Sequence, residues 1–459
     1  MLDAQCTRIA STPPIPQFVR MTRRLPWFAF AALCAFAPSA GAQQRLSRAE
    51  QRIAAAVDAN NARAIALLDE LVNINSGTMN FRGVRMVGDV LRAQLDSLGF
   101  RTRWVDGAPF GRAGHLVAEH SGARAGPKVL LIGHLDTVFE PSSPFQRYER
   151  LSDSTARGPG IIDMKGGDVI IVTALKALRD AGQLDRLNVV IVFNGDEESA
   201  GAPLTLARQA LRDAARGAQY AIGLEDGAGD PRTAVIARRS SGGWTLRVQG
   251  TPAHSSQIFT ESVGVGAVYE TARILTQFHA RLSDEQYLTF NPGMIVGGTL
   301  VSTDSTGTVG SAQGKTNVVA EHAFVAGDIR ALTPEQLARA RGVMREIVGE
   351  HLPHTSAEIA FDDGYPPMAP TDGNRRLLAM HSRASEDLGF GPVQAVDPAR
   401  AGAADVSFVA DIVPMKMDGI GLSGRDGHTV NETADLHMLP ALTKRLAVLL
   451  YRISGEPRP

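Results

Sequence analysis

Five residues of the types that bind zinc each follow an apolar run or lie in a glycine-rich turn. They are His134, Asp163, Glu198, Glu225 and His428. Imidazole nitrogens and carboxylate oxygens are ligands that zinc accepts, and two histidines with three acids suit a pair of ions that share one carboxylate. The residue types therefore predict a two-metal hydrolytic centre, with the ions about 3.5–4 Å apart.

Two further acids lie beside these candidate ligands. Glu197 directly precedes Glu198, and an extended backbone would send their side chains in different directions. Glu198 would then bind metal while Glu197 faces the attacking water as a general base. Asp136 follows His134 by two residues, close enough to orient the imidazole ring. Taken alone, this pair fits a core histidine followed by a turn residue equally well.

Three apolar runs must position these groups. Residues 128–133, 188–193 and 220–224 have the pattern of buried strands in a mostly parallel sheet. In such sheets functional side chains gather at the carboxyl ends of the strands. Helical patterns flank the runs, at residues 49–74, 83–98, 168–180, 374–388 and 440–453. The sequence therefore predicts an α/β domain, formed by residues 46–239 and 363–459, whose sheet is flanked by helices.

A second module interrupts this domain at residues 240–362. Its predicted strands cover residues 244–248, 294–300, 317–329 and 357–361, and its predicted helices cover residues 264–282 and 334–351. The order β-α-β-β-α-β is typical of a ferredoxin-like α+β unit. We expect an inserted lid or dimerisation domain.

The first 42 residues have the features of an export signal. Arg23 and Arg24 form a basic region, residues 27–37 are apolar, and Ala40-Gly41-Ala42 fits a cleavage site. The apolar run is too short to span a bilayer, so we expect cleavage, a periplasmic or secreted protein and no membrane span after processing; a membrane-anchoring helix is the alternative. Translation could begin at Met21. Cleavage would remove both cysteines, Cys6 and Cys34.

The net charge of the chain is -1, so its composition shows no basic surface of the kind that binds nucleic acid.

Four segments together indicate a family. They are G-H-L-D-T-V at residues 133–138, G-x-x-D-M-K-G-G at 160–167, D-E-E at 196–198 and G-x-x-G-H at 424–428. In this order and spacing the chain resembles the M20 metallopeptidases, and among them the glutamate carboxypeptidase branch. The resemblance covers the chain from about Ala49 to its last helix, and it implies a zinc-peptidase-like catalytic domain with an inserted lid.

The resemblance also implies a role for each candidate ligand. His134 and Glu225 would bind one zinc ion and His428 and Glu198 the other, with Asp163 as the bridge. Cobalt or manganese would also fit these ligands. Asp136 would orient His134, Glu197 would act as general base and then as acid, and the peptide bond after Asp163 is expected to be cis. Two alternatives stay open: Asp226 could replace Glu225, and Asp426 or His437 stands near His428.

In the inserted module the resemblance singles out residues that would face the substrate. His254, in Pro252-Ala253-His254-Ser255, would reach the active site of the partner subunit of a homodimer and stabilise the oxyanion. Asn317 and Arg330 would bind the substrate carboxylate. Without the resemblance, a surface salt bridge from Arg330 to Asp328 would be the better interpretation. The other histidines of this module, His279, His322, His351 and His354, are expected to be structural.

The predicted function is that of an exported di-zinc hydrolase. It would cleave a peptide or amide bond next to a C-terminal amino acid with a free carboxylate, using metal-activated water. Gly364-Tyr365-Pro366-Pro367 stands where glutamate carboxypeptidases carry Gly-Arg-Pro, so a preference for C-terminal glutamate is in doubt. A deacylase of N-acyl amino acids is the enzymatic alternative, and a catalytically inactive periplasmic binding protein is the non-enzymatic one.

Overall fold

The structure is a computed structural model that describes residues 46–226, 228–304 and 307–457, so the predicted signal segment lies outside the described residues. The helices are α1 (Arg48–Val72), α2 (Phe81–Ser97), α3 (Gly166–Asp180), α4 (Leu204–Ala207), α5 (Gln209–Ala215), α6 (Gly266–Leu282), α7 (Pro334–Gly349), α8 (Asp372–Asp387) and α9 (Met438–Ile453). Among the described residues, none of the helices combines the length and apolar character that crossing a membrane requires.

Ten of the described strands form the two main sheets. They are β1 (Arg101–Asp106), β2 (Gly114–Ser121), β3 (Lys128–His134), β6 (Asn188–Asn194), β7 (Tyr220–Gly223), β9 (Ser241–Gly250), β10 (Thr289–Gly298), β13 (His322–Arg330), β14 (Thr355–Tyr365) and β16 (Met415–Met417). Short strands complete the fold, namely β4 (Glu149–Arg150), β5 (Thr155–Arg157), β8 (Thr233–Ala234), β11 (Leu300–Thr303), β12 (Gly310–Gln313), β15 (Gln394–Ala395), β17 (Gly424–Arg425) and β18 (Thr433–Asp435).

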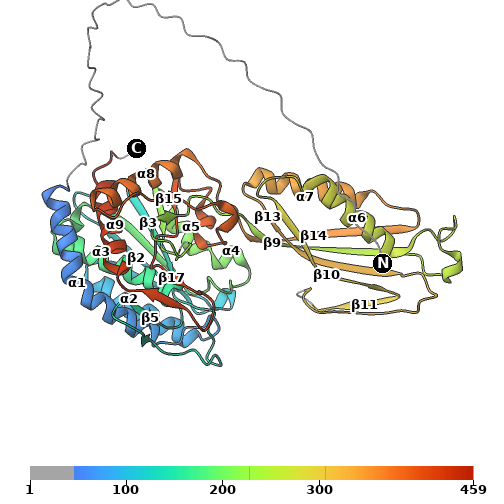
Figure 1. The fold of residues 1–459 in the computed structure, drawn as a ribbon, viewed down its shortest axis with the longest axis horizontal. Coiled ribbons are helices and arrows are strands. Elements are labelled where there is room, and N and C mark those ends of the chain that lie inside the picture. Colours follow the sequence, from blue (N-terminus) through green and yellow to red (C-terminus); the bar gives the residue numbers. More distant parts are fainter. Residues whose placement is uncertain (1–45, 227, 305–306, 458–459) are drawn as a thin grey trace, which may run out of the picture. The chain divides into compact units, whose positions relative to one another are not determined.

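The central sheet has the order β1-β2-β6-β3-β7-β16. Figure 1 labels two of its strands, β2 and β3, among the helices that surround the sheet. Strands β6, β3, β7 and β16 are parallel to one another, and β2 joins β6 in the antiparallel sense. The carboxyl ends of the parallel strands therefore open onto one edge. This confirms the predicted α/β class with a mostly parallel sheet.

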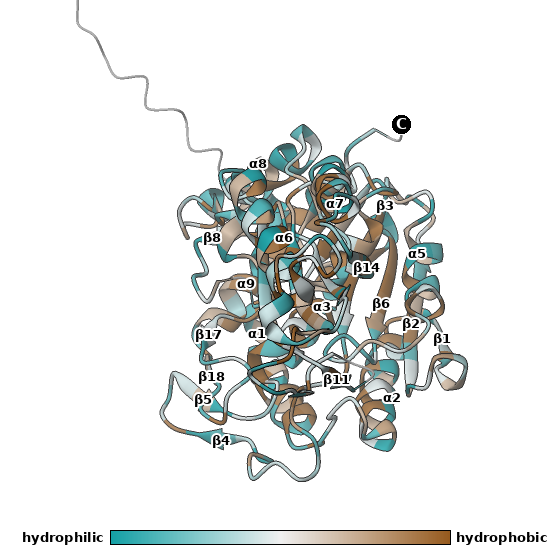
Figure 2. Cartoon of the chain, turned by 90° about the vertical axis from the view of Figure 1, so that its right-hand side faces the viewer, coloured by the Kyte–Doolittle hydropathy of each residue, from teal (hydrophilic) through white to brown (hydrophobic). Residues whose placement is uncertain are grey.

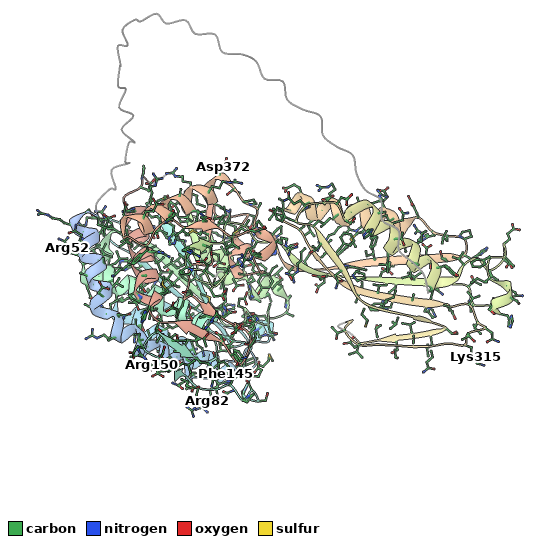
Figure 3. All side chains as sticks on the ribbon, viewed as in Figure 1. Arg52, Arg82, Phe145, Arg150, Lys315 and Asp372 are labelled. Carbon is green, nitrogen blue, oxygen red and sulfur yellow. The ribbon has the colours of Figure 1, made fainter. Side chains whose placement is uncertain are left out.

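Successive residues of β3 enter different cores. Leu131 packs in a core with α1, α2, α3 and α9, whereas Leu130 and Ile132 pack in a second core with α5 and the short helix Asp405–Val409. Alternation along a strand places these side chains on opposite faces, and helices cover both faces. Strand β6 accordingly carries the brown, hydrophobic colour in Figure 2. Charged side chains such as Arg52, Arg82 and Asp372 are exposed at the periphery (Figure 3).

The inserted domain is an antiparallel sheet of order β10-β13-β9-β14 with α6 and α7 packed against it. Its core includes Trp244 on β9 and Phe278 on α6, whose ring centroids lie 5.8 Å apart in an edge-on arrangement. The chain order from β9 to β14 gives the ferredoxin-like pattern expected from the sequence. The domain adds a short hairpin, β11–β12, between its second and third main strands.

One predicted strand needs correction, and one strand was not predicted. The predicted strand over residues 317–329 begins only at His322, because residues 315–318 form a turn in which the Val318 amide donates to the Lys315 carbonyl. Strand β1 pairs with β2 and was not expected from the sequence. Its apolar residues are few, so its partner rather than its own pattern makes it a strand.

Candidate metal centre

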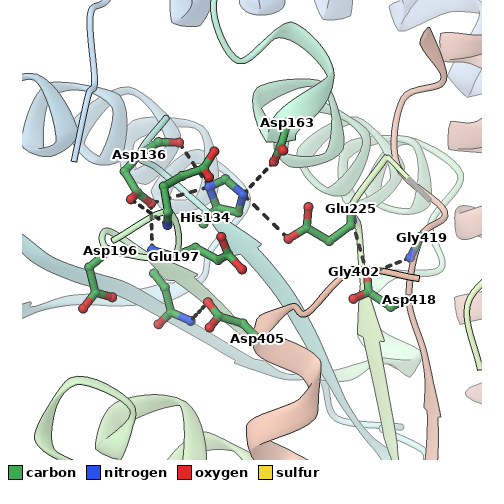
Figure 4. A network of polar contacts seen from close by, with 12 residues as sticks. His134, Asp136, Asp163, Asp196, Glu197, Glu225, Gly402, Asp405, Asp418 and Gly419 are labelled. Carbon is green, nitrogen blue, oxygen red and sulfur yellow. Dashed lines mark hydrogen bonds and ion pairs between the residues drawn. The ribbon is translucent and has the colours of Figure 1, made fainter. Parts of the chain in front are cut away.

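The candidate ligands meet at the carboxyl edge of the central sheet. His134 is the last residue of β3, Glu197 and Glu198 follow β6, and Glu225 follows β7. These strands are adjacent, so the topology alone brings three of the predicted groups together (Figure 4). Asp163 and His428 come from two loops outside the sheet.

Within the described residues the five form two groups that share Asp163. In the first, His134 Nε2 lies 3.0 Å from Asp163 Oδ1 and 3.6 Å from Glu225 Oε1. In the second, His428 Nε2 lies 2.7 Å from Asp163 Oδ2 and 3.2 Å from Glu198 Oε2. Each oxygen of Asp163 therefore faces one histidine, as a bridging carboxylate must.

A buried glutamate that the sequence analysis did not identify holds the Asp163 loop. Glu432 is fully buried and accepts hydrogen bonds from the backbone amides of Gly160, Ile162 and Asp163 at 2.9–3.2 Å. The peptide bond between Asp163 and Met164 is cis. Nothing in the local sequence marks Glu432, because its partners lie about 270 residues away in the chain.

Asp136 supports the site through the backbone more than through its predicted contact with His134. The Nδ1–H of His134 donates to the Asp136 carbonyl oxygen at 3.1 Å, while Asp136 Oδ1 is 3.5 Å from Nδ1. The carboxylate instead accepts the amide protons of Glu197 and Glu198, at 3.0 and 3.1 Å, and the Thr78 hydroxyl at 2.6 Å. Since Nδ1 donates, the Nε2 lone pair of His134 is left for a metal ion.

The backbone at Glu197 and Glu198 is a bend followed by a turn, which corrects the extended geometry expected from the sequence. Both amides point at the single carboxylate of Asp136, and that requirement curls the chain. The two side chains still separate, since Glu198 meets His428 and Glu197 does not join either metal group.

The structure distinguishes the alternative metal ligands, Asp226 and His437, from Glu225 and His428. Glu225, and not Asp226, stands with His134 in a group that could hold an ion. The amide of Glu225 donates to Asp418 at 3.3 Å, and Asp418 is itself paired with the buried Arg238 at 2.9 Å. His437 is exposed at the start of α9 and joins neither group, whereas His428 joins one from a left-handed backbone conformation with φ of 64°.

Burial and mutual repulsion dominate the electrostatics of the cluster. Burial raises the pKa of Glu197 and of Glu225 well above the usual range, against the opposing charge of His134. Burial also raises the pKa of Asp226, to about 7. Hydrogen bonds to Asp163 and Glu198 raise the pKa of His428 to about 11. Because several carboxyl groups are buried close together, a positive charge between them stabilises their ionised forms.

The donor set fits divalent cations by chemistry as well as by distance. Glu198 Oε1 is buried and has no hydrogen-bond partner among the described residues. A buried carboxylate oxygen without a partner is costly unless a cation or water meets it. His134, Glu225 and one oxygen of Asp163 would hold one ion, and His428, Glu198 and the other oxygen would hold the second.

The predicted substrate-facing residues lie at two ends of the inserted domain: His254 and Asn317 are beyond the His322 end of β13, and Arg330 is at its other end, next to the connection with the catalytic domain. His254 is exposed and bridges to Val318, and the Ser255 amide donates to the carbonyl of Asn317 at 2.9 Å. Arg330 donates from Nε to Asp328 at 3.1 Å, which is the salt bridge that its sequence context favours. Among the described residues, neither metal group includes a residue of this domain.

The sequence and the fold match known proteins. The sequence model of peptidase family M20/M25/M40 matches residues 130–452. Carboxypeptidase G2 from Pseudomonas sp. (strain RS-16) is 26% identical over 424 residues, which cover 91% of this chain and 95% of that protein.

Two solved structures share the fold. Aminopeptidase PepT from Bacillus cereus superimposes with a TM-score of 0.70 at 20% identity, covering 86% of this chain and 99% of that one. The Bacillus subtilis YXEP protein, a dinuclear metal-binding peptidase of the M20 family, does so with a TM-score of 0.58 at 17% identity and the same coverage.

The shared Asp163 leads to a prediction about metal content. Replacing His428 or Glu225 by alanine removes a ligand from one group only, so each variant should retain about one ion per subunit where the wild type holds about two. Asp163→Asn should weaken the binding of both ions. Metal analysis after dialysis, together with calorimetric titration of the metal-free protein, measures this.

His437→Ala is the matched control, because His437 is a neighbouring histidine outside both groups. It should bind metal as the wild type does. If the His428 variant kept both ions while the His437 variant lost one, the assignment of the second group would be wrong.

Proposed function

Because the chain belongs to peptidase family M20/M25/M40, we propose that it is an exported di-zinc hydrolase that cleaves the amide bond beside a C-terminal amino acid with a free carboxylate. Membership confirms the family expected from the motifs and makes the chain a metallopeptidase-type hydrolase. The kind and number of metal ions, the substrate and the residue roles are the proposal. Its main support is the carboxylate of Asp163, each oxygen of which faces one histidine. Glu197 lies nearby and belongs to neither group of candidate ligands.

Glu197 is proposed as the proton carrier of the reaction. Its half-buried side chain lies close to the charges of His134, Asp163 and Glu198. Desolvation raises its pKa above that of an ordinary glutamate, the direction that suits a group that must both take and return a proton. Bound divalent ions would lower the pKa of a water molecule and polarise the scissile carbonyl. Glu197 then accepts the proton of that water and delivers it to the leaving amine.

The inserted domain is proposed to recognise the substrate. Arg330 and Asn317 would fix the carboxylate of the leaving amino acid, and His254 would stabilise the developing oxyanion. Because Asn317 lies beside His254 and Arg330 lies at the other end of β13, Asn317 and His254 would come from one subunit and Arg330 from the other. Carboxypeptidase G2 is by its name a carboxypeptidase, which supports the choice of a C-terminal residue as leaving group. Tyr365 in place of an arginine leaves the side-chain preference open to a more apolar residue.

Amino-acid release from a panel of dipeptides, N-aroyl amino acids and N-acetyl amino acids tests the function. The zinc-loaded protein should release the C-terminal amino acid, and a chelator should abolish release. Glu197→Gln should lower kcat by about 10²- to 10⁴-fold while metal content stays unchanged. Release from small N-acyl substrates alone would move the assignment to a deacylase, and metal loss in the Glu197 variant would overturn its role as base.

We further propose that the active unit is a homodimer in which His254 serves the partner's metal centre. Tyr269 on α6 and Ile295 on the edge strand β10 are 54% and 58% exposed, so both elements present apolar side chains that a second copy could cover. His254 is exposed in this same domain. A second copy would cover the apolar side chains and bring in the imidazole.

Mixing two inactive variants tests this arrangement. In a mixed dimer of Glu197→Gln with His254→Ala, one of the two sites combines an intact Glu197 with an intact His254. After exchange of subunits an equal mixture should therefore regain about a quarter of the wild-type activity. The unmixed variants are the controls. A mixture as inactive as its components would contradict action across subunits.

Export is the last part of the proposal. Residues 1–42 have the basic, apolar and small-residue order of a cleaved signal. We expect the protein recovered outside the cytoplasm to begin at Gln43, as N-terminal sequencing would show. A mature protein that retained residues 27–37 would support the membrane-anchored alternative instead.

A further inference from the structure

The phenol of Tyr365 reaches from the end of the inserted domain to the backbone of Glu197. Tyr365 is the last residue of β14 and pairs with Ser241, the first residue of β9. These two strand ends are the connections between the inserted domain and the catalytic domain. The Tyr365 hydroxyl donates a hydrogen bond of 2.8 Å to the carbonyl oxygen of Glu197.

Buried groups of the catalytic domain fix the other side of this phenol. Arg208 Nη2 donates to the Tyr365 oxygen at 3.4 Å, and the ring lies against Phe408 with centroids 4.9 Å apart. Arg208 is almost wholly buried and is held by Asp196 at 2.6 Å and by Asp405 at 2.8 Å. The hydroxyl therefore both accepts from a rigid cation and donates to the Glu197 peptide.

Both backbone polar groups of Glu197 are hydrogen-bonded to side chains of other elements. Its amide donates to Asp136, which follows β3, and its carbonyl accepts from Tyr365, which ends β14. Among these contacts the one from Tyr365 alone comes from a strand of the inserted domain. A change in the position of that strand end would therefore act on the carbonyl of Glu197, whereas its amide is held by Asp136 from within the catalytic domain.

A cavity borders this connection between the two domains. Tyr365 and Ser241 line a cavity of about 540 Å³, together with Arg208, Pro334 and Phe408. Hinges between domains are a few residues at the ends of elements whose backbone angles change, and Tyr365 stands at such an end.

We propose that Tyr365 is a positioning residue that couples the orientation of β14 to the placement of the Glu197 carboxylate. This rests on the proposed role of Glu197 as base. When the inserted domain lies in one orientation, the hydroxyl holds the Glu197 peptide in place, and in another orientation that bond is lost. The Glu197 carboxylate is then in its catalytic position only when β14 is placed so that the Tyr365 hydroxyl reaches the Glu197 carbonyl.

Tyr365→Phe tests the coupling, since it removes the hydroxyl and keeps the ring against Phe408. We expect kcat to fall by about 10- to 100-fold, the scale for losing a partner that orients a site group, with KM and metal content unchanged. Hydrogen exchange of residues 196–201 in the metal-free protein should be faster in the variant. Tyr148→Phe is the matched control, because the buried Tyr148 hydroxyl has no partner among the described residues.

The outcomes separate this inference from the proposed function. If Tyr365→Phe keeps the wild-type kcat while Glu197→Gln is inactive, the coupling is overturned and the function stands. The same holds if metal loss accompanies the fall in kcat, or if Tyr148→Phe shows an equal fall. If the wild-type protein hydrolyses nothing on the panel, the proposed function fails and the coupling fails with it.

Discussion

The candidate metal centre depends on backbone amides that are held by a second set of buried carboxylates. Each segment that carries a metal-facing acid has its amide protons accepted by an acid from another element. Asp136 holds the turn after β6, Asp418 holds the residue after β7, and Glu432 holds the loop of Asp163. A carboxylate that accepts several amide bonds is fixed in place, and it fixes the backbone that donates them.

The topology explains two of these three contacts. Asp136 follows β3 and acts on the chain after β6, and Asp418 follows β16 and acts on the chain after β7. Strand β3 is the neighbour of β6, and β16 is the neighbour of β7. An acid placed just beyond one parallel strand thus meets the amides just beyond the next, so the sheet itself builds the support of the site.

The sequence predicted those features that each depend on a single strand. His134 and Glu225 could be identified because an apolar run ends beside each of them, and parallel strands end at one edge. The role of Glu432 could not be predicted, since it depends on a loop about 270 residues away in the chain. Tyr365 could be noted only as an unexpected residue, because its partner is a backbone carbonyl that any residue type would present.

The salt bridge of Arg330 is compatible with its proposed role in binding a carboxylate. Arg330 and Asp328 have side chains that are 35% and 43% exposed, and the bond uses Nε alone in the described part of the chain. Exposed pairs of this kind contribute about 0–1 kcal/mol, so a substrate carboxylate bound by both terminal nitrogens could replace the bond at little cost. The salt bridge is therefore compatible with the proposed substrate contact, and under that proposal it would keep the guanidinium paired until substrate binds.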